Sequence, residues 1–256
     1  PADDTWARDH GPIAVQTGDG TRLMDFRFNA WGGKFPWEKD NALNRHLANA
    51  GCFGDTPLEA VDFVLEGGSI ESDGQGTVMV TSECLMTPTR NPDYDRGAIE
   101  ALLGETIGAN RVLWLNHGYL AGDDTDSHID TLAICHVRCE DPEDEHYQAL
   151  AAMEEELRQF RQADGTPYQL TPLPWPDPIQ DEDGERMPAT YANFLIINGA
   201  VLVPVYDVPQ DAEALAILRD LFPEREIIPV PCRTLVEQHG SLHCVTMQLP
   251  AGVVEL

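Results

Sequence analysis

Short apolar runs and helix-spaced apolar residues alternate along this chain. Strands are expected at residues 62–65, 77–81, 111–115, 194–197, 200–205 and 226–230. Four helices are expected. One covers residues 40–50, a second begins after a cap at Asp93 or Asp95, and the others cover residues 142–162 and 211–222. Asn198-Gly199 separates two of the apolar runs, and this dipeptide is a strong signal for a two-residue hairpin. The alternation predicts an α/β fold, for which a doubly wound sheet and a (β/α) barrel are the usual forms.

Four polar motifs suggest a different arrangement, because they recur at nearly even intervals. They occupy residues 6–12, 65–69, 123–130 and 239–244. With Asp9, Glu66, His128 and Cys244 as markers, the intervals are 57, 62 and 116 residues, and the last is twice 58. Even spacing predicts a structural repeat of about 58 residues, arranged as a ring that brings one side chain per repeat to its axis. A further repeat would then reach its polar position near residue 186, where Tyr191 and Asn193 are the candidates.

The excess of acidic over basic residues restricts the kinds of molecule that this chain is expected to bind. The chain has 44 acidic and 16 basic residues, which gives a net charge of −28. Phosphate groups would be repelled at every contact, so nucleic acid and anionic membranes are disfavoured and a small cationic substrate is favoured. An acidic, solvated surface adapted to high salt is the alternative explanation. No apolar run approaches a membrane span, and the sequence begins without a signal-peptide pattern, so a cytoplasmic protein is expected.

The six cysteines are scattered and contain no Cys-x-x-Cys pair. This distribution fits neither a disulfide scaffold nor a zinc ribbon, and most of these cysteines are expected to be reduced core residues. Cys244 differs from the others because it ends a polar motif, His-Gly-Ser-Leu-His-Cys.

The motifs together resemble the agmatine deiminase branch of the guanidino-group-modifying enzymes, which includes the bacterial peptidylarginine deiminase-like proteins. The resemblance extends from Asp4 to Pro250, through residues 31–37, 66–69, 122–130, 144–147, 191–194 and 239–244. It implies a five-bladed α/β-propeller (pentein) with pseudo-fivefold repeats, formed as one catalytic domain over residues 1–256. Relatives have a further blade before the Trp-x-Arg-Asp motif, so the N-terminal blade is expected to be missing or incomplete here. The hairpin at residues 133–135 is expected to be shorter than in relatives.

Cys244 is the expected nucleophile, because a guanidinium carbon is a poor electrophile and requires a strong nucleophile held in position. A buried structural thiol is the alternative, and the resemblance decides against it. His128 is expected to protonate the departing ammonia and then activate water. Strand alternation would place Asp130 on the same side as His128. A metal site at Asp124, Asp126, His128 and Asp130 is the competing interpretation, since all four are competent ligands.

The remaining site residues are expected to hold the substrate. Asp9 and Glu66 are candidates because carboxylates match the paired N–H donors of a guanidinium. The resemblance implies that Asp9 and Asp130 bind the guanidinium nitrogens, with Glu66 close to His128. Further substrate-binding candidates are Trp6 as an apolar or cation–π wall, Gly67 as a turn beside the ligand, and Asp124 as the partner of a distal ammonium.

The resulting hypothesis is a hydrolase that uses neither cofactor nor metal, and that converts agmatine to N-carbamoylputrescine and ammonia in putrescine biosynthesis. Deimination of free or peptidyl arginine and amidino transfer are the alternatives within the class. A non-catalytic or metal-binding module on the same fold is the alternative outside it. The sequence leaves a homo-oligomer open.

Overall fold

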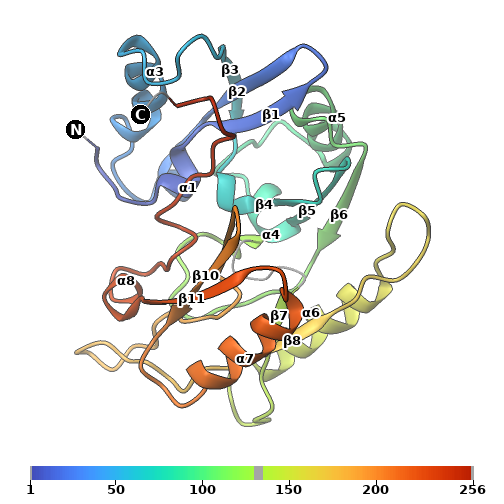
Figure 1. The fold of residues 1–256 in the computed structure, drawn as a ribbon, viewed down its shortest axis with the longest axis vertical. Helices are drawn as coiled ribbons and strands as arrows, with labels where there is room; N and C mark the ends of the chain where they lie inside the picture. Colours follow the sequence, from blue (N-terminus) through green and yellow to red (C-terminus); the bar gives the residue numbers. More distant parts are fainter. Residues whose placement is uncertain (1, 130–134, 255–256) are drawn as a thin grey trace. The chain divides into compact units, whose positions relative to one another are not determined.

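The computed structural model describes residues 2–129 and 135–254, and it separates into two compact units (Figure 1). The first unit comprises Pro1–Leu113 and Val245–Leu256, and the second comprises Trp114–Cys244. The expectation of one catalytic domain over residues 1–256 concerns how these units combine, and it stays a prediction. Among the described residues, no helix is sufficiently long and apolar to span a bilayer.

The first unit contains two modules of the same type, each with two antiparallel strands, a helix and a further strand. In the first module, β1 (Ile13–Thr17) and β2 (Gly20–Arg27) form a hairpin, and α3 (Asp40–Asn49) leads to β3 (Leu58–Val64), which pairs in parallel with β2. In the second module, β4 (Ile70–Ser72) pairs with β5 (Thr77–Thr81), and α5 (Arg96–Ile107) leads to β6 (Arg111–Leu115) beside β5. The short elements of this unit are α1 (Ala7–His10), α2 (Ala30–Gly33), the 3-10 turn η1 (Gly67–Ser69) and α4 (Ser82–Leu85).

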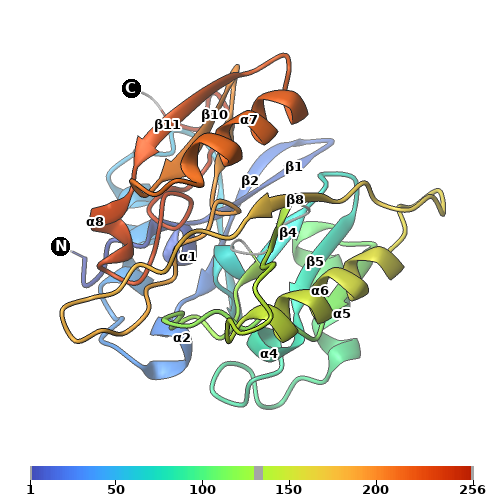
Figure 2. The same ribbon diagram turned by 90° about the horizontal axis from the view of Figure 1, so that it is seen from below.

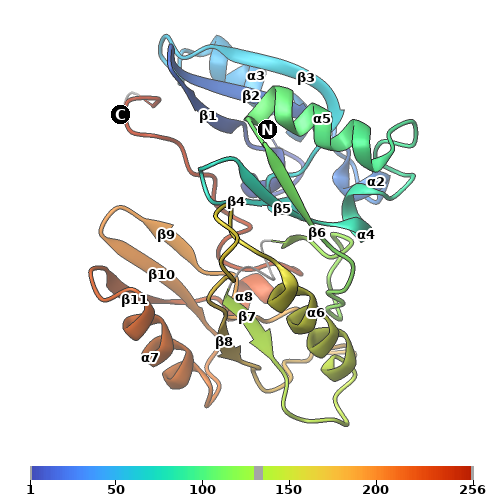
Figure 3. The ribbon, with the colours of Figure 1, turned by 90° about the vertical axis from the view of Figure 1, so that its right-hand side faces the viewer.

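The second unit contains one module of this type, and another for which the structure describes a strand, a helix and a further strand. β7 (Cys135–Arg138), α6 (Tyr147–Gln159) and β8 (Thr171–Pro174) form a parallel crossover in which α6 packs on β7 (Figure 3). β9 (Leu195–Ile197) and β10 (Ala200–Val205) form a hairpin, and α7 (Asp211–Leu221) returns the chain to β11 (Glu226–Pro231) beside β10. α7 lies along this sheet, as Figure 2 shows, and α8 (Arg233–Val236) follows β11.

The element order supports the predicted repeat. The strands that precede each crossover helix begin at residues 20, 77, 135 and 200, so successive starts are 57, 58 and 65 residues apart. The predicted hairpin at Asn198-Gly199 is confirmed, with Gly199 at φ 78°, a conformation that favours glycine. Asp95, rather than Asp93, caps α5: its side chain accepts a hydrogen bond from the backbone N of Ala98.

Two predicted elements have different limits. The strand expected at 62–65 begins earlier, at Leu58, because it pairs with β2. The helix expected at 142–162 begins only at Tyr147. Its expected first turn is replaced by tight turns, in which the Asp144 carboxylate accepts hydrogen bonds from the backbone N and the ring of His146.

The proline-rich stretch after α6 contains a strand that the sequence did not predict. β8 includes Pro172 and Pro174, and within the described part of the chain its sheet consists of β7 and β8. Proline has no backbone donor and is found in edge strands, where that donor is not needed. The prolines therefore explain why the sequence pattern did not indicate this strand.

Glu154 joins α6 to β7, and we expect it to set the acid stability of this module. Its carboxylate accepts hydrogen bonds from Arg138 Nε at 2.9 Å and Nη2 at 2.6 Å, and it pairs with His136 Nε2 at 3.2 Å and with Arg158. The Arg138 guanidinium, opposed by burial, lowers the pKa of Glu154 from 4.5 to about 2. A lowered folded-state pKa stabilises the protein above pH 4.5, and this contribution disappears as the pH falls towards 2.

Glu154→Gln should therefore cost about 2 kcal/mol of unfolding free energy at pH 7, because hydrogen bonds to a charged group are lost. Urea unfolding followed by circular dichroism at several pH values would measure this. The difference from wild type should be constant above pH 5 and should shrink towards pH 2. A difference that persists unchanged at pH 2 would contradict the assignment.

Candidate active site

In the first unit, the carboxylate of Asp9 is held in a fixed orientation by two donors. Asp9 lies in α1 and is buried. Its Oδ2 accepts a hydrogen bond from Trp31 Nε1 at 2.9 Å, and its Oδ1 accepts one from the backbone N of Gly68 at 3.0 Å. Two predicted motifs therefore meet at this side chain, which is the arrangement needed to orient a carboxylate towards a cation.

Trp31 reaches Asp9 from a strained corner. The four consecutive residues of α2, from Ala30 to Gly33, have φ values of 50°, 53°, 89° and 84°. Left-handed backbone is costly for residues other than glycine and is concentrated at functional sites. A Cβ atom on Gly32 would lie 2.3 Å from Thr89 Oγ1, so this position needs glycine for space as well. The corner directs the indole of Trp31 towards the carboxylate.

Glu66 is fully buried and forms an ion pair that the sequence did not predict. Arg90 Nε donates to Glu66 Oε1 at 2.8 Å and to Oε2 at 3.0 Å, and both side chains are inaccessible to solvent. The guanidinium of Arg90 thus holds both oxygens of this carboxylate in place. The predicted grip of Glu66 on a substrate guanidinium stays a prediction.

Gly67 and Trp6 are both buried in the first unit. A Cβ atom on Gly67 would lie 2.1 Å from the carbonyl oxygen of Arg8, so glycine here allows a close backbone approach. The side chain of Arg8 donates to Gln248 Oε1 at 3.1 Å and thereby holds the C-terminal segment. The substrate-binding roles of Trp6 and Gly67 stay predictions.

In the second unit, His128 ends a tight loop and does not lie on a strand, so the predicted strand alternation with Asp130 is wrong for the described part. Asp126 and Ser127 both have φ values of 62°. The Asp123 carboxylate accepts hydrogen bonds from the backbone N of Thr125 at 2.9 Å and of Ser127 at 2.8 Å, which closes the loop locally. His128 itself is 1% exposed. Asp130 lies outside the described residues, and its role stays a prediction.

The start of this loop is anchored by two histidines. His146 Nε2 accepts a hydrogen bond from the backbone N of Ala121 at 2.8 Å, so the proton of a neutral ring lies on Nδ1, 2.8 Å from Asp144 Oδ1. His239, in the last motif, places Nδ1 3.1 Å from the carbonyl oxygen of Gly122. The loop that carries His128 is therefore fixed by residues distant in the sequence.

Asp144 is the centre of this anchor. Burial opposes ionisation, but hydrogen bonds from the backbone and ring of His146, from Arg186 and from Trp175 hold the pKa of Asp144 well below its usual range. Arg186 Nη1 lies 2.7 Å from Asp144 Oδ2. A permanently ionised carboxylate keeps the His146 ring oriented.

Asp124 is exposed at the outer side of the same loop. Among the described residues of the second unit, no three histidine, cysteine or acidic ligand atoms lie close enough to hold one metal ion. The alternative metal site at Asp124, Asp126, His128 and Asp130 includes Asp130, which lies outside the described residues, so it stays an alternative. The predicted contact of Asp124 with a distal ammonium stays a prediction.

Cys244 is the cysteine best suited to be a nucleophile. It is partly exposed, whereas Cys84, Cys135, Cys139 and Cys232 are buried. Burial raises the pKa of Cys135 to about 12, and it also raises the pKa values of Cys139 and Cys232. Cys52 is partly exposed too, but it packs against an apolar cluster that includes Phe53. A thiol must ionise to attack carbon, so the buried cysteines are disfavoured.

Residues 1–250 match the Porphyromonas-type peptidyl-arginine deiminase family. The chain belongs to this family. The agmatine deiminase of Ectopseudomonas mendocina is 38% identical over 281 residues, covering 97% of this chain and 75% of that protein. A C. jejuni agmatine deiminase, solved as a cysteine-to-serine variant with substrate bound, has 41% identity and a TM-score of 0.89, covering 96% and 73% of the two chains. A Porphyromonas gingivalis protein provisionally named an arginine deiminase has 53% identity and a TM-score of 0.96, covering 100% and 78%.

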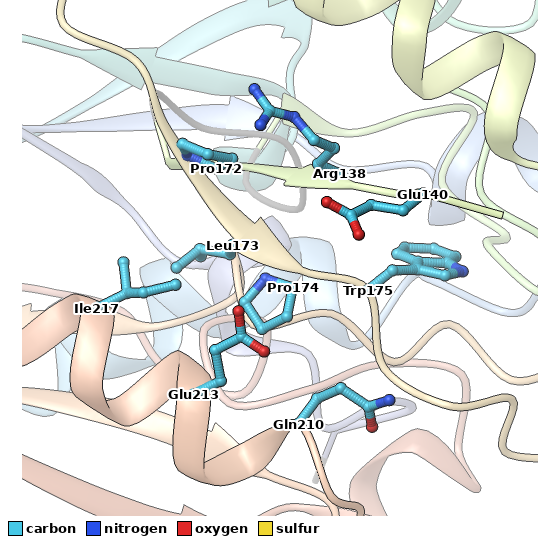
Figure 4. A pocket seen from close by; sticks show the side chains of 9 residues that line it. All are labelled: Arg138, Glu140, Pro172, Leu173, Pro174, Trp175, Gln210, Glu213 and Ile217. Carbon is cyan, nitrogen blue, oxygen red and sulfur yellow. The ribbon is translucent and has the colours of Figure 1, made fainter.

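Members of this family act on guanidino groups, so we compared the predicted site residues with the lining of a hollow in the second unit, which Figure 4 shows. That hollow, of about 420 Å³, lies between β8 and α7 and is lined by Trp175, Leu173, Ile217 and several polar side chains. It includes none of the predicted site residues, and its single guanidinium, that of Arg138, is engaged by Glu154. We therefore assign the hollow no part in deimination.

Two residues of the site were not found, or only partly found, from the sequence. Arg90 lies 24 residues after Glu66 in an irregular segment, and no local pattern marks it. Asn193 was a candidate from the repeat spacing and lies in one of the motifs that carry the family resemblance, but no role was predicted for it. In the structure its amide contacts both Cys244 and the backbone of His243.

Proposed function

We propose that this chain is a cysteine-dependent deiminase that hydrolyses agmatine to N-carbamoylputrescine and ammonia. The observation that carries the proposal is Cys244: among six cysteines it combines partial exposure, a polar motif and a polar contact to sulfur. Membership of the peptidyl-arginine deiminase family supports guanidine chemistry. The agmatine deiminases at 38% and 41% identity support agmatine as the substrate.

We further propose that the two units form one catalytic domain of the five-bladed propeller type. The support is the strand–helix–strand order, which recurs in both units, and the likeness to solved agmatine deiminases over nearly the whole chain. In such a domain, Asp9 and Glu66 from the first unit would act with His128 and Cys244 from the second. Cytoplasmic location and a role in putrescine synthesis stay predictions, and a homo-oligomer stays open.

The proposed reaction has two halves. The Cys244 thiolate attacks the guanidinium carbon, a C–S bond forms, and the C–N bond to one terminal nitrogen breaks as His128 gives that nitrogen a proton and ammonia leaves. A water molecule then attacks the thiouronium carbon, His128 accepts its proton, and the C–S bond breaks to give the ureido product and the thiolate. Asp9 would hold the guanidinium, because its carboxylate is already oriented by Trp31 and Gly68.

Ammonia release after addition of agmatine to chelator-treated protein is the test of this function. Release of one ammonia for each ureido product, unaffected by chelator, is the expected result. Activity that the chelator abolishes would favour the metal-binding alternative, and no ammonia from any guanidine would favour a non-catalytic module.

We expect agmatine to be preferred over arginine by more than about a hundredfold in kcat/KM. Arginine adds an α-carboxylate, and an unpaired carboxylate taken into a site costs about 2 to 5 kcal/mol. The loop before His128 carries acids at Asp123, Asp124 and Asp126, and Arg8 is engaged with Gln248. A hundredfold ratio needs only about 2.7 kcal/mol. Steady-state kinetics with both substrates would measure it, and comparable values would refute the preference.

Asp124→Asn should reduce this preference if Asp124 meets the distal ammonium of agmatine. Asp19→Asn is the matched control, because Asp19 is exposed at the β1–β2 turn. This substitution changes the net charge by the same amount as Asp124→Asn. The control should keep the wild-type ratio. An equal fall in both variants would show long-range charge, rather than a contact, to be responsible.

A further inference from the structure

We propose that Asn193 is a further catalytic residue, whose side-chain amide donates a hydrogen bond to Cys244 Sγ and holds the sulfur as a thiolate. This inference rests on the proposed role of Cys244 as the nucleophile. It deepens that role, because it identifies the group that stabilises the attacking form. No basic side chain is needed for this effect: a hydrogen bond to the charged form of an acid favours that form.

The orientation of the Asn193 amide follows from its neighbour. The backbone N–H of His243 can only donate, and it lies 2.8 Å from Asn193 Oδ1. The oxygen is thereby fixed towards His243, so the NH₂ group must turn to the other side. There Asn193 Nδ2 lies 3.4 Å from Cys244 Sγ. The usual ambiguity between the amide oxygen and nitrogen is resolved by this backbone donor.

The same amide can serve both protonation states of the cysteine. Cys244 Sγ also lies 3.7 Å from Asn193 Oδ1, a distance at which a neutral thiol can donate. An ionised sulfur can only accept, and the Nδ2–H group is then its partner. Loss of the thiol proton therefore exchanges a longer, weak hydrogen bond for a charge-assisted one, without movement of Asn193.

Burial strengthens this contact. Asn193 is completely inaccessible to solvent, so water does not compete for its amide hydrogens. In such surroundings a hydrogen bond is electrostatically stronger than at the surface. Cys244, in contrast, is partly exposed.

A second network fixes the two segments that carry these residues. Tyr206 OH lies 2.8 Å from both the carbonyl oxygen of Thr190 and the Oγ of Ser241. Thr190 Oγ1 accepts a hydrogen bond from the backbone N of Ala192 at 3.2 Å. Residues 190–193 and 241–244 are thus joined by Tyr206 as well as by Asn193. The Tyr206 hydroxyl thus joins the backbone of one segment to a side chain of the other.

The test measures the pH dependence of Cys244 alkylation by iodoacetamide, with the modified peptide identified by mass spectrometry. No substrate is involved in this measurement. A protein without deiminase activity would therefore contradict the proposed function, but the alkylation midpoint could still be measured. Asn193→Asp keeps the shape and the acceptor for His243 but replaces the donor with a negative charge. The alkylation midpoint should rise by at least about one pH unit. Asn193→Ala should raise it by less, because it removes the donor without adding charge.

Tyr206→Phe is the matched control. It removes one hydroxyl from the same two segments and leaves the amide in place, so it should lower the unfolding temperature and leave the midpoint unchanged. An unchanged midpoint in folded Asn193→Asp would overturn the proposal, and so would an equal rise in Tyr206→Phe.

A measurement on the wild-type protein covers the case in which neither Asn193 variant folds. With asparagine side chains labelled with ¹⁵N, the Asn193 NH₂ resonance should titrate with the same midpoint as Cys244 alkylation. A resonance that does not move through that midpoint would contradict the contact.

Discussion

Cys244→Ser is expected to lower the rate of ammonia release from agmatine by at least about 10⁴-fold. A serine hydroxyl is much less acidic than a thiol, so it would not be ionised beside Asn193 and would attack the guanidinium carbon poorly. Serine has nearly the same shape as cysteine, so the circular dichroism spectrum and the unfolding midpoint should stay close to wild type. The release rate would be measured under saturating agmatine.

Cys52→Ser is the control for this variant. Cys52 is the other partly exposed cysteine, and its contacts are with an apolar cluster. This variant should retain its turnover at a modest cost in stability. A covalent adduct found on Cys139 or Cys232, together with an active Cys244→Ser protein, would show that Cys244 is not the nucleophile.

Arg90→Met is expected to cause the largest loss of stability, about 3 to 5 kcal/mol at pH 7. Both Arg90 and Glu66 are inaccessible to solvent, so removal of the guanidinium leaves a buried carboxylate without its cation. The carboxylate must then bind a proton or expose itself, and both cost free energy at neutral pH. Urea unfolding at pH 7 would measure the loss.

Two further variants test the cause. Arg90→Met combined with Glu66→Gln should recover a large part of the lost free energy, because no buried charge remains. Arg22→Met, which breaks the pair between Arg22 and Glu59 with side chains 44% and 42% exposed, should cost less than about 1 kcal/mol. An equal cost for the Arg90 and Arg22 variants would show that burial does not determine the strength of the Glu66 pair.

The sequence predicted those parts of the fold that are set by nearby residues. β5 and β6 have the predicted limits, because continuous apolar runs are bounded by turns. The hairpin at Gly199 was predictable because its glycine is needed at a positive φ value. β1 and β2 were missed, and β8 was hidden by its prolines, because their strand character is decided by pairing partners that lie elsewhere in the chain.

The candidate site was predictable in composition but not in contacts. The motif spacing singled out Asp9, Glu66, His128 and Cys244, and it pointed to Asn193 only as a polar position. The partners of these residues depend on long-range folding: Trp31 approaches Asp9 from a strained corner, and Arg90 reaches Glu66 from an irregular segment. The Asp123 carboxylate replaced the expected strand before His128 with a loop, and a competition of this kind between side chain and backbone is difficult to judge from sequence.

The return of the chain to the first unit after Cys244 has a consequence for synthesis on the ribosome. Gln248 pairs with Arg8, and Val253 packs against Leu23 and Phe53. A nascent chain therefore exposes one side of the first unit until more than 240 residues have been made. Domains commonly fold as they emerge from the ribosome. The first unit therefore keeps apolar surface uncovered until the second unit has been translated and the C-terminal segment follows. Cys244, the proposed nucleophile, leaves the ribosome just before the segment that completes the first unit.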